Sequence, residues 1–202
     1  MIIKIVCAGV DGFKNLYSPD PDEFLIGVDG GIYHIIDRGL NVDLAVGDFD
    51  SCDIGEVIRH CSNVKRYPRE KDFSDLELAV REAITMKGER IEIYNATGGR
   101  LDHFIAALNV VAAYSDYRLV MFDERNRIYV ISSDTAVKKS KYKYCSFFAL
   151  ENGAEITLSG FKYPLEAYRP RPFDNLCLSN EIVGEEGLVK VNGKKILVIE
   201  TL

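Results

Sequence analysis

The chain of 202 residues is long enough for one large domain or two modest ones. Its hydrophobic content of 47% and charged content of 28% are those of an ordinary globular protein with a sizeable core. A formal net charge of −6 argues against nucleic acid as a partner. Anions that are chelated to a metal can still bind a protein of this charge. The five cysteines show neither CxxC spacing nor a partner histidine pattern, so they indicate neither a disulfide framework nor a zinc site.

The first apolar run, residues 2–8, is too short to span a membrane and lacks the charged start of a signal peptide. We therefore expect a cytoplasmic protein with no membrane partner.

The first 125 residues alternate between strand and helix patterns. Strands are predicted at residues 2–8, 24–28, 42–46, 64–67, 91–94 and 118–122. Helices are predicted at residues 32–39, 54–60, 74–87 and 102–114. Such alternation predicts an α/β domain with a doubly wound, largely parallel sheet.

The helix at residues 74–87 has the clearest pattern of the chain. Its apolar side chains recur at helical spacing, at Leu76, Ala79, Val80, Ala83 and Ile84. Ser74 and Glu77 form a capping-box pattern, and Gly88 supplies a stop.

The chain changes character after Asp123. Residues 126–202 lack a helical period but hold β-rich runs, at 128–132, 142–150, 155–159, 176–179 and 196–199. Asn192-Gly193 between two of these runs predicts a β-hairpin. We therefore expect an α/β domain at 1–125 followed by a small all-β, sandwich-like domain at 126–202.

Two carboxylates, Asp48 and Asp50, follow the apolar run 42–46. Side chains alternate along an extended chain, so the two are expected to point the same way. Paired carboxylates with no base between them need a cation, and hard oxygen ligands favour Mg²⁺. The alternative is that Asp48-Phe49-Asp50-Ser51 is a turn that caps the next helix.

Three other segments at strand–helix junctions repeat this acidic or glycine-rich character. They are Asp29-Gly30-Gly31, Lys71-Asp72-Phe73-Ser74-Asp75 and Gly98-Gly99-Arg100-Leu101-Asp102-His103. Each alone is explained by helix capping or a tight turn. Together they indicate one site, because ligands of open α/β sheets bind outside the carboxyl ends of the strands.

The chemistry that these segments favour is metal-assisted handling of phosphates. Gly98 and Gly99 let the backbone approach a phosphate chain, and Arg100 offers a fork for phosphoryl oxygens. The aspartates would hold Mg²⁺ against those oxygens. No G-x-x-x-x-G-K-[ST] sequence occurs, which excludes a P-loop enzyme.

The ordered set DGG, GDFDS, KDxSD and GGRxDH, followed by Gly160-Phe161-Lys162-Tyr163-Pro164-Leu165 and Ser179-Asn180, resembles the thiamine pyrophosphokinase family over the whole chain. The resemblance implies transfer of the pyrophosphoryl group of ATP to thiamine, giving thiamine diphosphate and AMP. It also implies a catalytic domain at 1–125 that binds ATP and Mg²⁺, and a thiamine-binding domain at 126–202. The family is homodimeric, with thiamine held between subunits.

The resemblance assigns roles to particular residues. The Mg²⁺ ligands are expected to be Asp48, Asp50 and Asp75. Further catalytic residues are expected at Asp72, Arg100 and Asp102. Nucleotide binding is expected at Asp29, Gly30, Thr97, Gly98, Gly99, Arg100 and His103.

Thiamine is expected to contact Tyr163, Ser179 and Asn180. Tyr163 stands where members of the family often have a tryptophan that stacks on thiamine, and this chain has no tryptophan. A tyrosine ring still presents a π face to a cationic heterocycle.

Three other functions remain open on the sequence alone. One is a pyrophosphokinase that acts on a hydroxymethyl pterin. Another is a phosphatase resembling the haloacid dehalogenases, with Asp48 as nucleophile and Asp50 as acid. The third is a nucleotide- or vitamin-binding module without turnover.

Overall fold

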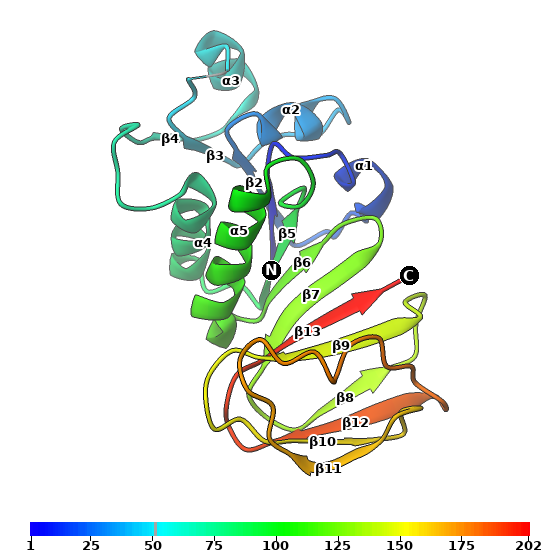
Figure 1. The fold of residues 1–202 in the computed structure, drawn as a ribbon. Helices are drawn as coiled ribbons and strands as arrows, with labels where there is room; N and C mark the ends of the chain where they lie inside the picture. The colour runs from blue at the N-terminus through cyan, green and yellow to red at the C-terminus, as the bar shows by residue number, and fades with distance from the viewer. Residues whose placement is uncertain (51) are drawn as a thin grey trace. The chain divides into compact units, whose positions relative to one another are not determined.

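The computed structural model describes residues 1–50 and 52–202, so Ser51 of the predicted acidic motif lies outside the described residues. The chain divides into two compact units, Met1–Glu124 and Arg125–Leu202 (Figure 1). The expected arrangement, a mixed α/β fold followed by a β domain, is confirmed. In the described part of the chain, no helix combines the length and apolar character that crossing a membrane requires.

The first unit is built on parallel strands. They are β1 (Ile2–Val6), β2 (Glu23–Val28), β3 (Leu44–Gly47), β4 (Val64–Arg66), β5 (Arg90–Tyr94) and β6 (Leu119–Phe122). Their order is β4-β3-β2-β1-β5-β6, and each neighbouring pair is parallel. The carboxyl ends of all six strands therefore lie along one edge of the sheet. Strand order reverses between β1 and β5, the switch point where open sheets form a ligand crevice.

Within residues 1–50 and 52–124, five α-helices connect these strands. They are α1 (Phe13–Leu16), α2 (Gly31–Ile36), α3 (Ile54–His60), α4 (Asp75–Thr85) and α5 (Leu101–Ala113). Helices α4 and α5 pack side by side (Figure 1). A core cluster joins the sheet to α1, α2 and α3, and it includes Phe13, Ile32 and Val57.

The start of α4 is capped by Ser74, but Glu77 does not take the role that the predicted capping box gives it. The Ser74 side chain accepts a hydrogen bond from the Glu77 backbone N–H at 3.2 Å, which caps the helix. The Glu77 carboxylate does not close the capping box but accepts from Arg81 and the Tyr114 hydroxyl. It thereby ties α4 to the end of α5.

The second unit is a sandwich of two antiparallel sheets. Its strands are β7 (Asn126–Ile131), β8 (Thr135–Lys138), β9 (Tyr144–Ala149), β10 (Ile156–Ser159), β11 (Leu165–Tyr168), β12 (Glu186–Val191) and β13 (Ile196–Thr201). Strands β7, β13 and β9 are neighbours in that order within one sheet, and β11-β10-β12-β8 form a four-stranded sheet. Buried side chains from both sheets, such as Phe147 and Leu158, form one core.

Two local predictions in this unit are wrong. Residues 176–179 form turns and not a strand, and Ser179 has a left-handed backbone with φ +58°. Asn192-Gly193 does not close a hairpin, because β12 pairs with β10 and β8 whereas β13 pairs with β7 and β9. This turn carries the chain from one sheet to the other. Asn192-Gly193 therefore predicted the turn correctly but not the pairing of the strands on either side of it.

Candidate active site

Three carboxylates and one lysine form an acidic group at the carboxyl ends of β2 and β3. Asp29 follows β2, Asp48 follows β3, and Asp75 opens α4. The Lys71 ammonium lies 2.8 Å from Asp75 Oδ1 and 3.8 Å from Asp48 Oδ2. Both Lys71 and Asp48 are largely buried, with 13% and 16% of their side chains exposed. We refer to these four residues as the acidic group.

Asp29 belongs to the group electrostatically. Burial, and then the nearby charge of Asp75, raise the pKa of Asp29 from 3.8 to about 6. The backbone N–H of Phe49 donates to its Oδ1 at 3.4 Å and opposes that rise. Gly47 makes the approach possible, because a Cβ there would lie 1.8 Å from Asp29 Oδ1.

The chain between Asp48 and Asp50 is not extended, so the alternation argument does not apply to this pair. Alternation requires an extended chain, but Phe49 has φ +56° and its ring is buried in the core. The Asp50 backbone N–H donates to Asp48 Oδ1 at 3.1 Å. Its own carboxylate is 52% exposed and lies 3.7 Å from Arg69. Asp72 is also exposed.

The donors of the acidic group fit a hard divalent cation in kind. Among residues 1–50 and 52–202, no three His, Cys, Asp or Glu side chains are gathered closely enough to hold a metal ion. Asp75 Oδ1, however, is buried and has no partner in hydrogen-bond geometry, even though Lys71 lies 2.8 Å away. A buried carboxylate oxygen in that state is a ligand atom that Mg²⁺ favours.

The glycine-rich turn after β5 forms a second part of the site. Gly98 and Gly99 have backbone φ angles of +81° and +75°, which residues with a side chain rarely adopt. Arg100 occupies the N-cap position of α5, and its guanidinium makes two contacts with the Asp102 carboxylate. This interaction lowers the pKa of Asp102 to about 2. A phosphate that binds Arg100 would compete with Asp102.

Two further predicted residues flank this turn. Thr97 is half-buried, and its carbonyl oxygen lies beside the loop that follows β1. His103 is exposed on the first turn of α5. Gly30, at the start of α2, approaches the same β1 loop, since a Cβ on it would lie 3.3 Å from the Ala8 Cβ.

Sequence reasoning missed the loop that joins β1 to α1. The Asn95 side-chain oxygen accepts hydrogen bonds from the backbone N–H groups of Gly12 and Phe13, at 3.0 and 2.8 Å. Gly9 lies so close that a Cβ on it would be 2.1 Å from the Asn95 carbonyl oxygen. The loops after β1 and β5 thus meet at the switch point. The available signal was the pair Gly9 and Gly12 directly after the first strand.

The predicted thiamine contacts lie in the second unit and differ in exposure. Tyr163 exposes 59% of its surface. Asn180 is buried, and its side-chain oxygen accepts from the backbone N–H groups of Tyr163 and Glu181, both at 3.0 Å. Its amide nitrogen donates to the Tyr163 carbonyl at 2.8 Å. Ser179 is exposed, and its backbone N–H donates to the Ser146 hydroxyl.

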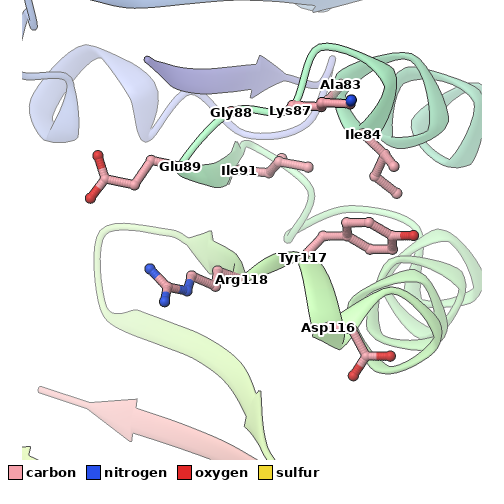
Figure 2. Close-up of a pocket in the computed structure, with 9 residues that line it drawn as sticks. All are labelled: Ala83, Ile84, Lys87, Gly88, Glu89, Ile91, Asp116, Tyr117 and Arg118. Carbon is pink, nitrogen blue, oxygen red and sulfur yellow. The ribbon is translucent and has the colours of Figure 1, made fainter.

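A pocket of about 220 Å³ lies elsewhere in the first unit. Figure 2 shows its lining from the end of α4 and from the segment between α5 and β6, with Lys87, Glu89, Asp116, Tyr117 and Arg118 among the side chains. It borders the amino ends of β5 and β6. The candidate site lies at the carboxyl ends, so the two do not coincide.

The fold defines a two-unit protein, with a parallel α/β sheet that carries the candidate site in the first unit and a β-sandwich as the second unit. Residues 18–122 match the family described as "Thiamin pyrophosphokinase, catalytic domain". Residues 130–197 match "Thiamin pyrophosphokinase, vitamin B1 binding domain". The chain therefore belongs to the thiamin pyrophosphokinase family.

Individual relatives agree with this membership. A Bacillus subtilis protein named thiamine pyrophosphokinase is 32% identical over 198 residues, which cover 92% of this chain and 91% of the relative. The crystal structure of a B. subtilis thiamine pyrophosphokinase superposes with a TM-score of 0.90 at 28% identity, covering 100% of this chain and 99% of that one. The structure from Geobacillus thermodenitrificans gives a TM-score of 0.87 at 29% identity, with 100% and 98% covered.

Proposed function

We propose that this protein transfers the pyrophosphoryl group of ATP to the hydroxyl of thiamine, producing thiamine diphosphate and AMP. The observation that carries the proposal is the acidic group at the carboxyl edge of the sheet, in which Lys71 contacts Asp48 and Asp75 and interacts electrostatically with Asp29. An anionic substrate would approach such a group only with a cation. A metal-bound polyphosphate meets that condition.

The reaction is an in-line displacement at the β-phosphorus. The thiamine oxygen forms a bond to that phosphorus while the bond to the oxygen bridging it to the α-phosphate breaks. AMP leaves with the bridging oxygen, and the hydroxyl proton passes to a carboxylate of the acidic group. Positioning and electrostatics supply most of the rate, because phosphoryl transfer needs little covalent help from the protein.

Magnesium would be held by Asp48, Asp75 and Asp50, the last after its side chain turns away from Arg69. Bound there, it would neutralise charge on the polyphosphate. Asp72 is the adjacent acidic residue.

The nucleotide would lie along the turn after β5. Backbone N–H groups of Gly98 and Gly99 would face the phosphates, and Arg100 would exchange Asp102 for a phosphoryl oxygen. Asp29, Gly30, Thr97 and His103 would border the same ligand.

Thiamine would stack on the exposed ring of Tyr163, with Ser179 beside it and Asn180 holding the Tyr163 backbone. We further propose a cytoplasmic homodimer in which one subunit's β domain meets thiamine at the partner's catalytic domain. Light scattering on the purified protein tests the dimer.

The test of function is a direct one. Protein, Mg-ATP and thiamine are incubated together, and AMP and thiamine diphosphate are quantified. The Asp75→Asn variant is the matched control, because it keeps the size of the side chain and removes its charge. Folded, dimeric protein that forms neither product would refute the proposal. A hydroxymethyl pterin offered at equal concentration, and a phosphomonoester offered without acceptor, test the two other enzyme classes.

A further inference from the structure

Lys71 is placed unusually for a surface-loop lysine. It precedes α4, yet only 13% of its side chain is exposed, and its ammonium lies between two carboxylates of the acidic group. Lys65 offers a contrast within the same unit. It pairs with Glu82 at 2.6 Å, but half of its side chain faces solvent.

The contacts of Lys71 are electrostatic and only loosely directed. The distance to Asp48 is 3.8 Å, and Asp75 Oδ1 lacks hydrogen-bond geometry despite the 2.8 Å separation. Within the acidic group the three carboxylates outnumber the single ammonium, and the nearby Arg66 guanidinium donates to the Asp48 backbone carbonyl and not to a carboxylate of the group. Lys71 is therefore held in the acidic group mainly by charge.

We propose that Lys71 is the resident counter-ion of the acidic group, which leaves it for a phosphate oxygen when a divalent cation enters with a nucleoside triphosphate. The inference rests on the magnesium–nucleotide chemistry of the proposed function. It adds that Lys71 makes the binding of Mg²⁺ and ATP cooperative.

The physical basis is competition for the same oxygens. A lysine ammonium and Mg²⁺ cannot both occupy the space between Asp48 and Asp75. When Mg²⁺ enters alone, the displaced ammonium loses its carboxylates and gains only water. When a polyphosphate enters as well, the flexible lysine stem carries the ammonium to a phosphoryl oxygen. Each ligand therefore lowers the cost of binding the other.

The experiment is a calorimetric titration of Mg²⁺ into metal-free protein, with and without α,β-methylene-ATP. This analogue is chosen because the α–β bridge is the bond that breaks in the proposed reaction. The variants are Lys71→Met, which removes the charge, and Lys71→Arg, which keeps it. Lys65→Met is the control, since it removes one lysine charge from a carboxylate pair outside the acidic group.

The wild type and Lys71→Arg are expected to bind Mg²⁺ weakly alone and more tightly with the analogue. Lys71→Met should bind Mg²⁺ alone at least about tenfold more tightly. A positive charge this close to the carboxylates weakens the binding of a second cation by that order, and the substitution removes it. It should also lose most of the benefit from the analogue. Lys65→Met should match the wild type.

An unchanged Mg²⁺ affinity in Lys71→Met, or an equal gain in Lys65→Met, would overturn the inference. If Lys71→Met does not fold, the wild type alone decides: equal Mg²⁺ affinity with and without the analogue contradicts the coupling. None of these titrations contains thiamine or measures turnover. A protein that shows the Lys71 pattern but makes no thiamine diphosphate would lose the proposed function and keep this inference.

Discussion

The acidic group of the first unit and the Tyr163 segment of the second hold their polar atoms in opposite ways. In the acidic group, Asp75 Oδ1 is buried without a well-directed partner, and Lys71 is shared between two carboxylates. Beside Tyr163, the Asn180 amide makes three hydrogen bonds within the protein, and the exposed feature is an aromatic ring.

This difference indicates what each region can bind. Polar atoms that lack good internal partners keep their capacity for charged ligands, whereas a satisfied amide serves to fix the backbone around it. In the proposed function the acidic group would therefore hold a cation, and a phosphate only through that cation, whereas the Tyr163 segment would meet the flat face of a heterocycle. Substitutions in the acidic group should therefore change the reaction rate. Substitutions in the Tyr163 segment should change stability and the affinity for the acceptor.

The largest effect is expected at the acidic group. Asp48→Asn and Asp75→Asn should each lower the rate of product formation by about a thousandfold, because charge stabilisation is usually the dominant catalytic contribution. Thermal unfolding should remain close to that of the wild type. Initial rates of AMP release and a melting curve check both statements. Asp116→Asn, exposed and outside the group, is the control, and turnover retained in the two variants would remove these carboxylates from the site.

Asn180 should act on stability first. Asn180→Ala removes an amide that is 3% exposed and leaves the Tyr163 backbone groups unpaired. A loss of about 2–3 kcal/mol in the free energy of unfolding is expected, measurable by urea denaturation. The KM for thiamine should rise while the KM for ATP stays constant. Ser179→Ala is the neighbouring control, because its backbone N–H contact with Ser146 persists. Equal stability of the two variants would contradict this role.

Tyr163 should affect the acceptor alone. Tyr163→Ala removes a ring and should raise the KM for thiamine about tenfold, the size expected for loss of a cation–π contact of 1–2 kcal/mol. Tyr163→Trp should restore it, and as the chain's sole tryptophan it should change fluorescence when thiamine is added. A rise in the KM for ATP of similar size would show that the effect is not local to the acceptor.

Local signals predicted helices well because their causes lie within a few residues. The pattern at 54–60 coincides with α3 (Ile54–His60), and Ser74 caps α4 as expected. Pairing between strands depends on distant partners. Asn192-Gly193 therefore looked like a hairpin, although β12 and β13 belong to different sheets.

The sequence indicated which carboxylates lie near one another better than it indicated how their side chains are arranged. That Asp29, Asp48 and Asp75 gather follows from their places after parallel strands and at a helix start. The non-extended chain between Asp48 and Asp50 results from the left-handed Phe49, whose bulky side chain gives no sequence signal for that conformation. The central position of Lys71 depends on a loop fold that periodicity does not predict.

The smallest effect is expected from Asp29, and its sign is opposite to that of the other changes. Its native pKa is about 6 against an ordinary 3.8, so between these pH values the native state binds more protons than the unfolded state. Stability from this residue is thus present at low pH and is lost as the pH rises to 6. Asp29→Asn should stabilise metal-free protein above pH 6 by about 1 kcal/mol, a figure reduced for partial exposure.

Urea denaturation in EDTA at pH 4 and pH 7.5 measures the difference. Wild type and Asp29→Asn should unfold alike at the lower pH, because both side chains are then neutral in the native state. The variant should be more stable at the higher pH, and Asp116→Asn should show no such divergence. A destabilised Asp29→Asn at pH 7.5 would mean that the native carboxylate is favourably paired. The negative charge of Asp29 would then already be neutralised within the protein and would not help to attract a metal ion.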